Sequence, residues 1–395
     1  MEYIPLYNIS LLGGQYFFAG DRTKLNGNVN ARFAPVMKMN DEWTLLPIYR
    51  GSFRGTKAVT DAVGSGTLFS QGMDHRVAFT GVYSDPESTW KLKPSVNYKY
   101  EFLKETRDET WGKGLFDYET SGVSFEGENV YMEPFSYRLG YDFYYVRFPN
   151  YVSLESKSGV DPNGNALNRE NAGTRVLDTF NHQFNAVVTL PVPTQDPKLS
   201  LEMGYRVLWQ TFPDQPIIDE AGQPTNHDPA KRQDFTNSLS FNLGYPRKIM
   251  GGRVRMGNGF YTGFAYNGSN QNTYDAGQTH FVGDTYSYWS LSFGPNVNFA
   301  WGEEKRPITA GAGLTFSRQQ YFNRRIQDGS GVYLDGTLRQ DRAIFGLSYG
   351  YPIAQNFRLS AQTNFLWASS NMRYEKVYKY TYNAATYLMG FTYDY

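Results

Sequence analysis

The sequence predicts an all-β protein, an antiparallel up-and-down barrel of about 16 strands that spans a membrane. Three observations lead to this fold class. Apolar and polar residues alternate over segments of ten or more residues, short and long links alternate between these segments, and most tryptophans fall into two belts on the apolar face. The whole chain, residues 1–395, is therefore expected to form one transmembrane β-barrel domain.

The alternation has a period of two almost everywhere. Odd positions from residue 199 to 209 are Leu, Leu, Met, Tyr, Val and Trp, whereas all even positions but one are small or polar. The same pattern runs through residues 289–301 and 356–367. Soluble strands average about 5–6 residues, but membrane-spanning strands need about 9–11. The segments that match this template are 5–18, 26–38, 42–54, 73–84, 89–102, 115–126, 130–148, 179–192, 198–211, 234–247, 252–267, 284–301, 307–321, 331–350, 356–369 and 378–395.

The links between these segments alternate in length. Links after even-numbered segments are short, such as residues 39–41 and 127–129, and most links after odd-numbered segments are long and polar, such as 55–72, 149–178 and 211–233. An up-and-down barrel with an even strand count has short turns on the periplasmic side and longer extracellular loops. No segment carries a helical pattern or the ~18 apolar residues that a membrane-spanning helix needs.

Tryptophan positions give an independent check on the register. Two of them, Trp289 and Trp301, share one segment. At ~3.4 Å per residue and ~40° of tilt, they lie roughly 30 Å apart along the barrel axis. That spacing suits an apolar band about 25 Å tall between two aromatic girdles. The membrane-interface aromatics are Trp43, Trp90 and Trp301 at the turn ends and Trp209, Trp289 and Trp367 at the loop ends.

Composition excludes several classes of protein. The chain has no Cys, which rules out disulfides, thiolate nucleophiles and Cys-ligated metal clusters. It carries 38 Lys+Arg and 38 Asp+Glu, so it lacks the basic excess that is typical of nucleic-acid binders, and no nucleic-acid partner is expected. Its N-terminus lacks a basic region followed by an apolar stretch, so a signal peptide for export is expected to lie outside this numbering.

The last segment ends in alternating aromatic and apolar residues with a glycine among them. This ending resembles the C-terminal signature of Gram-negative outer-membrane β-barrels, although Leu388 stands where that family prefers a polar residue. The resemblance implies a location in the Gram-negative outer membrane, contact with its lipid and recognition by the barrel assembly machinery. It covers the architecture and does not choose between porin-like and export barrels. The residues of the assembly signal are Tyr387, Gly390, Phe391, Tyr393 and Tyr395.

Strand parity assigns most strand charges to the polar face, which must surround a water-filled lumen. Acids on this face are few, namely Glu101, Asp142, Glu202 and Asp394, so the balancing acids are expected in loops and turns. A basic lumen inside a low-dielectric wall concentrates anions. The alternative is that loops 149–178 and 211–233 fold inward and pair with these cations. The predicted lumen-lining cations are Arg32, Arg50, Arg54, Arg76, Lys91, Lys93, Lys99, Arg138, Arg206, Arg253, Arg255, Arg342 and Arg358.

No constellation of catalytic or metal-binding residues is evident. The four histidines lie far apart at positions 75, 182, 227 and 280, and His182 has the lipid-facing parity. Residues 161–165 are rich in Asp and Asn but lack the remaining ligands of a calcium loop. We therefore expect no enzyme activity, no cofactor and no bound metal.

Three functions fit these observations. The first is an outer-membrane channel that passes hydrophilic, anionic solutes by passive diffusion. The second is a barrel that exports an anionic polymer such as a polysaccharide. The third is a structural barrel that holds a partner protein in a larger envelope-spanning complex. Barrels of this size often form homo-oligomers, but no residue pattern here marks a trimer interface.

Overall fold

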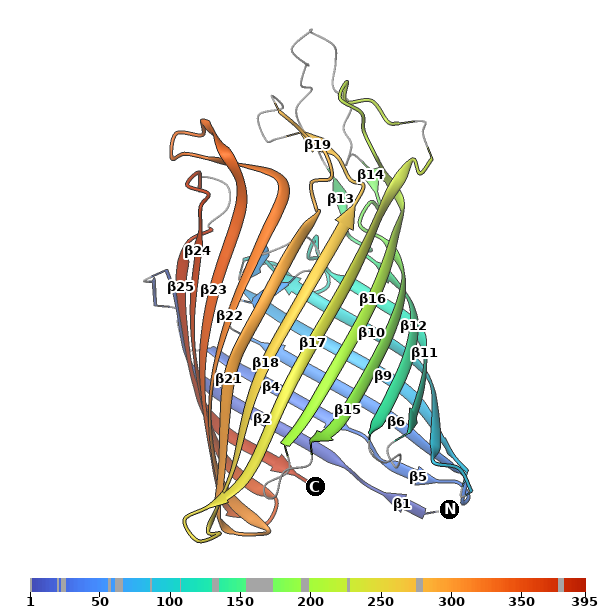
Figure 1. Ribbon diagram of the computed structural model, residues 1–395, viewed down its shortest axis with the longest axis vertical. Helices are drawn as coiled ribbons and strands as arrows, with labels where there is room; N and C mark the ends of the chain where they lie inside the picture. Colours follow the sequence, from blue (N-terminus) through green and yellow to red (C-terminus); the bar gives the residue numbers. More distant parts are fainter. Residues whose placement is uncertain are drawn as a thin grey trace.

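A computed structural model describes residues 2–19, 21–22, 26–55, 58–60, 67–85, 87–106, 108–129, 135–153, 173–192, 199–225, 228–274, 280–375 and 380–395. These residues form a closed antiparallel barrel of 16 strands (Figure 1). No helix in this part of the chain is long and apolar enough to span a membrane. Both chain ends lie at the lower rim of the barrel in Figure 1, and the longer loops project from the upper rim.

The barrel wall consists of strands that pair with their sequence neighbours, and β2 pairs with β25 to close the ring. The break between β4 and β5 falls at Ala34 and Pro35, because proline cannot donate to the hydrogen-bond ladder. The 16 wall strands are β2 (Tyr7–Phe18), β4 (Asn26–Phe33), β6 (Trp43–Arg54), β9 (Gln71–Ser84), β10 (Trp90–Lys104), β11 (Tyr118–Asn129), β12 (Ser136–Arg147), β15 (Thr179–Val192), β16 (Leu199–Pro216), β17 (Lys231–Ile249), β18 (Val254–Ser269), β21 (Tyr288–Glu303), β22 (Arg306–Gln327), β23 (Tyr333–Ala354), β24 (Phe357–Ser370) and β25 (Tyr382–Asp394).

The remaining strands are short. Three of them extend the edges of the wall: β1 (Glu2–Ile4), β3 (Asp21–Arg22) and β5 (Val36–Lys38). The others form two-stranded pairs within the long links: β7 (Ala58–Thr60) with β8 (Thr67–Phe69), β13 (Val152–Ser153) with β14 (Gly173–Thr174), and β19 (Thr273–Tyr274) with β20 (Phe281–Val282).

Each of the predicted segments corresponds to one wall strand, so the predicted fold class is confirmed. The main difference is at the loop rim, where β16, β17 and β22 extend beyond their segments, whereas β23 gains its extra residues at the turn rim. The β22–β23 pairing runs as far as Gln327 and Tyr333, around a turn in which the Asp328 carboxylate accepts hydrogen bonds from the backbone N–H groups of Ser330 and Val332. A hairpin satisfies its own backbone in water, so pairing continues beyond the point where the two-faced pattern stops.

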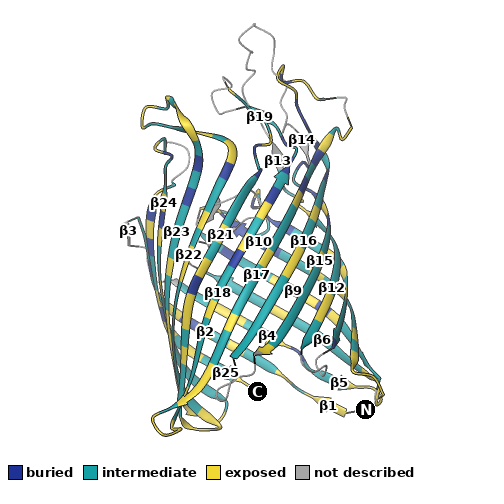
Figure 2. Ribbon diagram, viewed as in Figure 1, coloured by how far each residue is buried: buried dark blue, intermediate teal, exposed yellow. Residues whose placement is uncertain are grey.

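The two faces of the wall differ in burial, as the alternating colours along the strands of Figure 2 show. At the seam, Leu12 and Leu388 are only 3% and 4% exposed, whereas their neighbours Leu11 and Met389 are 58% and 62% exposed. The concave side of a closed sheet crowds its side chains together, so the less exposed parity faces the lumen. This is the parity that carries the polar residues, and the apolar parity faces outward, as in membrane-spanning barrels.

Candidate functional site in the barrel lumen

A row of cations crosses four neighbouring strands on the lumen face. The register places Arg32 of β4 opposite Arg50 of β6, Arg50 opposite Arg76 of β9, and Arg76 opposite Lys99 of β10. Directly opposite residues have their Cβ atoms about 4.5–5.5 Å apart. The wall therefore holds these charges side by side. We call Arg32, Arg50 and Arg76 the arginine row.

Two cations next to the arginine row, Lys99 and Arg54, have an acidic partner, whereas the arginine row has none in the described ranges. Lys99 Nζ lies 2.5 Å from Glu101 Oε2, and Arg54 Nη2 lies 3.0 Å from Glu101 Oε1, so one buried carboxylate serves both. The arginine row has no ion pair and no hydrogen bond to any residue in the described ranges. Its positive charge is therefore left for water and solutes.

A second group of lumen cations is neutralised within the wall. Lys93 Nζ lies 3.0 Å from Glu126 Oε1 and 2.6 Å from Glu128 Oε2, and Arg138 Nε lies 3.8 Å from Glu126 Oε2. On β10, β11 and β12 the lumen cations are therefore paired, but with glutamates of the wall and not with acids on the loops, which the alternative expected. Lys91 also lies in this group, where the register sets it opposite Glu128.

The predicted set of four lumen acids was too small. Asp74 has the parity of Arg76 on β9, and Glu126 and Glu128 have the lumen parity of β11. Of the predicted acids, Asp142 accepts hydrogen bonds from Gln183 and Asn185, and Glu202 accepts one from Asn242. Asp394 accepts one from Asn8. The basic excess of the lumen is thus smaller than parity alone indicated, and it is concentrated in particular places.

The remaining predicted cations occupy different positions. Arg206 on β16 and Arg358 on β24 have the lumen parity, and Arg342 on β23 does too, donating to Gln340 Oε1 at 3.4 Å. The placement of Arg253 on a strand was wrong. β18 begins only at Val254, because Gly251 and Gly252 adopt positive φ angles of 65° and 88° in a tight turn that also includes Arg253.

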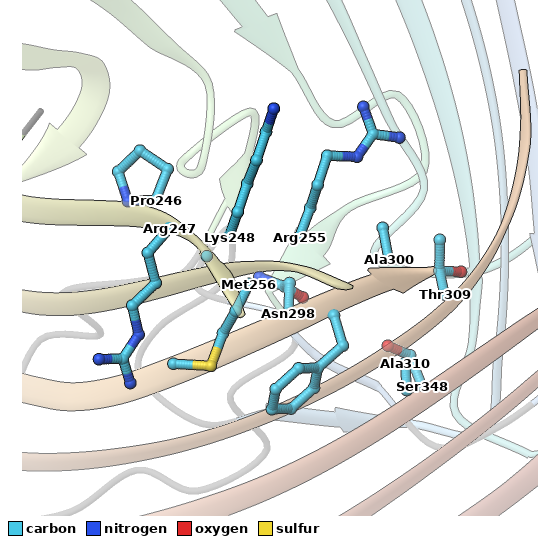
Figure 3. Close-up of a pocket in the computed structure, with 12 residues that line it drawn as sticks. Pro246, Arg247, Lys248, Arg255, Met256, Asn298, Ala300, Thr309, Ala310 and Ser348 are labelled. Atoms are coloured by element: carbon cyan, nitrogen blue, oxygen red, sulfur yellow. The ribbon is translucent and has the colours of Figure 1, made fainter. Parts of the chain in front are cut away.

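Sequence reasoning missed Lys248, which faces the lumen directly opposite Arg255. The predicted segment ended one residue earlier, at 247, although the alternation continues to Ile249. Figure 3 shows Lys248 and Arg255 pointing to one side of the sheet, and Arg247 and Met256 pointing to the other.

The outer face carries the aromatic residues of the predicted belts. Trp43 packs against Tyr83 with ring centroids 5.2 Å apart, Trp90 against Tyr137 at 4.9 Å, and Trp209 against His182 at 5.5 Å. Trp289, Trp301 and Trp367 have the same outward parity. The predictions did not include Trp111, which folds back from its loop onto the outward-facing rings of Phe53 and Phe102, at 6.1 and 6.5 Å.

The C-terminal signature lies at the seam that closes the barrel. Tyr387, Phe391 and Tyr393 face outward, and the Tyr395 ring stacks on Tyr7 of β2 at 4.7 Å. Gly390 faces inward, where an added Cβ would overlap the carbonyl oxygen of Leu11. Gly390, a residue of the pattern that resembles an assembly signal, thus allows the first and last strands to approach each other closely.

The histidines lie apart in the described residues. His75 and His182 face outward, each with Nδ1 2.9 Å from a tyrosine hydroxyl, and His280 packs against Tyr333. His227 and residues 161–165 are outside the described ranges. In the part of the chain that the structure describes, no three His, Asp or Glu residues are grouped to hold a metal ion.

Comparison with known proteins finds no matching family model and no matching curated protein. Among solved structures, the chain is similar to a bacterial polysaccharide outer membrane secretin, with 9% identity over 99% of this chain and 98% of that one, at a TM-score of 0.47. It is also similar to a loop-deletion mutant of OmpT, an outer membrane protein of Vibrio cholerae, with 12% identity over 100% and 99% of the two chains and a TM-score of 0.44. A third is the copper transporter OprC, with 10% identity over 93% of this chain and 55% of that one, at a TM-score of 0.43.

The first two of these proteins are named as outer membrane proteins. The similarity selects no family and no substrate. The function therefore has to be argued from the lumen of this chain.

Proposed function

We propose that this protein is a passive channel of the outer membrane that favours small hydrophilic anions and performs no catalysis. The observation that carries the proposal is the arginine row, three adjacent lumen cations without an acidic partner in the described ranges. Fixed positive charge in a water-filled passage with low-dielectric walls raises the local concentration of anions.

The same barrel provides a contrast that supports this proposal. On β10, β11 and β12, Lys93 and Arg138 are matched by glutamates across the strands. On β4, β6 and β9, like charges instead stand directly opposite each other, which destabilises a sheet. A wall that served only as a scaffold has no use for this repulsion, whereas a selective channel does.

The experiment is conductance of the purified barrel in a planar bilayer under a salt gradient. We expect discrete openings and a reversal potential that indicates anion preference. A silent barrel would overturn the channel, and a reversal potential of the opposite sign would overturn its selectivity.

A further inference from the structure

The wall from β18 to β24 has a different chemistry from the arginine row. β18 lies half-way round the ring of 16 strands from β6, and β24 lies four strands from β6, so this wall begins opposite the arginine row and runs toward the closing seam. There the register alternates amides with glycines. Asn298 stands between Gly257 and Gly311, and Asn296 stands between Gly259 and Gly313.

These glycines give the polar side chains room to lie against the wall. A Cβ on Gly311 would come within 2.7 Å of both Asn298 Oδ1 and Ser348 Oγ, and one on Gly346 would lie 3.0 Å from Asn364 Oδ1. The amides therefore lie over bare backbone and leave a hollow of about 280 Å³, bordered by Asn296, Asn298, Gln362 and Asn364 among others.

The polar groups of this hollow have unused hydrogen-bonding capacity. Within the described ranges, neither the four amides named above nor Ser348 makes a hydrogen bond to the protein. Each amide offers two N–H donors and a carbonyl acceptor. By contrast, three amides on other strands of the lumen are engaged: Gln183 and Asn185 donate to Asp142, and Asn242 donates to Glu202.

A pair of cations lies at the turn end of the same wall. Lys248 and Arg255 are exposed and directly opposite one another, and neither has an ion pair within the described ranges (Figure 3). They border a hollow of about 770 Å³ together with Asn298, Thr309 and Ser348. This volume falls within the ~300–1,000 Å³ that is usual for small-molecule sites. The two hollows share Asn298 and Ser348, and we call them together the amide groove.

We propose that the amide groove binds hydroxyl-rich carboxylates of the uronic acid type. The planar guanidinium of Arg255 suits bidentate binding of a carboxylate, and the Lys248 ammonium adds a second charge. The sugar hydroxyls, which donate and accept, match the unpaired amides and Ser348. This inference rests on the proposed channel and names its substrate class.

The test is the block of ion current through the purified barrel by three probes: D-glucuronate, methyl α-glucoside and acetate. Glucuronate carries both the hydroxyls and the charge, and each of the others carries one of them. We expect glucuronate to block at a concentration about tenfold or more below either of the others, because charge and hydroxyl contacts act together. Equal block by acetate and glucuronate would overturn the proposal.

Variants locate the site. Exchanging Lys248 and Arg255 together for Gln should raise the half-blocking concentration of glucuronate about tenfold or more, and Asn298→Ala should raise it without changing block by acetate. Arg253→Gln is the matched control, since it removes a cation from the adjacent turn, and it should have no effect. Unchanged glucuronate block in the double variant also overturns the groove. An anion-selective barrel without this block would refute the groove alone, whereas cation selectivity in plain salt would refute the channel proposal.

Discussion

Removal of the arginine row should reduce the selectivity of the pore by a calculable amount. The variant replaces Arg32, Arg50 and Arg76 with Gln, which keeps polar side chains of similar length in the row. One charge acting on an ion at ~10 Å in water contributes ~0.4 kcal/mol, and a Debye length of ~10 Å at 0.1 M salt reduces this to ~0.15 kcal/mol. Because the three charges stand on neighbouring strands, an ion passes them at similar distances, and together they contribute ~0.45 kcal/mol. The row attracts an anion and repels a cation equally, so the difference is ~0.9 kcal/mol, or about fourfold in the permeability ratio.

The assay is the reversal potential in bilayers at two ionic strengths. The triple variant should lose about fourfold in anion preference near 0.1 M salt, and it should match the parent near 1 M, where the Debye length is only about 3 Å. Lys113→Gln and Lys305→Gln are the controls, because both residues are exposed outside the wall strands. An unchanged ratio at low salt would refute the electrostatic reasoning. So would an equally large change at high salt, because screening should remove the effect.

Three further predictions concern the stability of the barrel. Gly390→Val should prevent closure of the seam and abolish heat-modifiable migration on gels, whereas Gly13→Val, where no atom lies within 4 Å of the added Cβ, should fold normally. Arg232→Met leaves the buried Asp234 carboxylate without its ion pair at 2.5 Å, so unfolding in urea should show a loss of about 3–5 kcal/mol, and adding Asp234→Asn should restore part of it. Burial raises the pKa of the Asp117 carboxyl, so this carboxyl binds its proton more tightly in the folded loop than in the unfolded chain. The stability of the folded loop should therefore rise as the pH falls below neutrality. Hydrogen exchange of the loop amides measures this, and an Asp117→Asn variant with the same pH dependence would contradict it.

The sequence predicted the strand count, the strand order and the two faces because these depend on local pattern. Each wall strand has one apolar and one polar face, so the alternation of its own residues is enough to predict both faces. The belts of Trp43 and Trp209 followed from the same parity. Trp111 could not be found this way, because it reaches the outer face only when its loop folds back onto Phe53 and Phe102.

The charge pattern of the lumen could be predicted only in part, because it depends on register between strands. Parity placed Lys93 and Arg50 on the same face, but it could not show that Lys93 stands opposite Glu126 whereas Arg50 stands between two other arginines. Strand ends were a second source of error. A shift of one or two residues at the β17–β18 turn added Arg253 to the wall and omitted Lys248.

The zero net charge of the chain thus conceals an asymmetric lumen. One wall carries cations that no acid of the described ranges neutralises, a neighbouring wall carries matched charges, and the wall from β18 to β24 carries amides and glycines that leave its centre uncharged. The arginine row acts on the concentration of anions in the lumen, whereas the proposed amide groove acts on their affinity. A hydroxyl-rich carboxylate in the groove meets Lys248 and Arg255 with its charge and the unpaired amides with its hydroxyls. A small symmetrical anion gains only the contacts of its charge. The proposed groove therefore discriminates between anions of equal charge, and the comparison of glucuronate with acetate measures this discrimination directly.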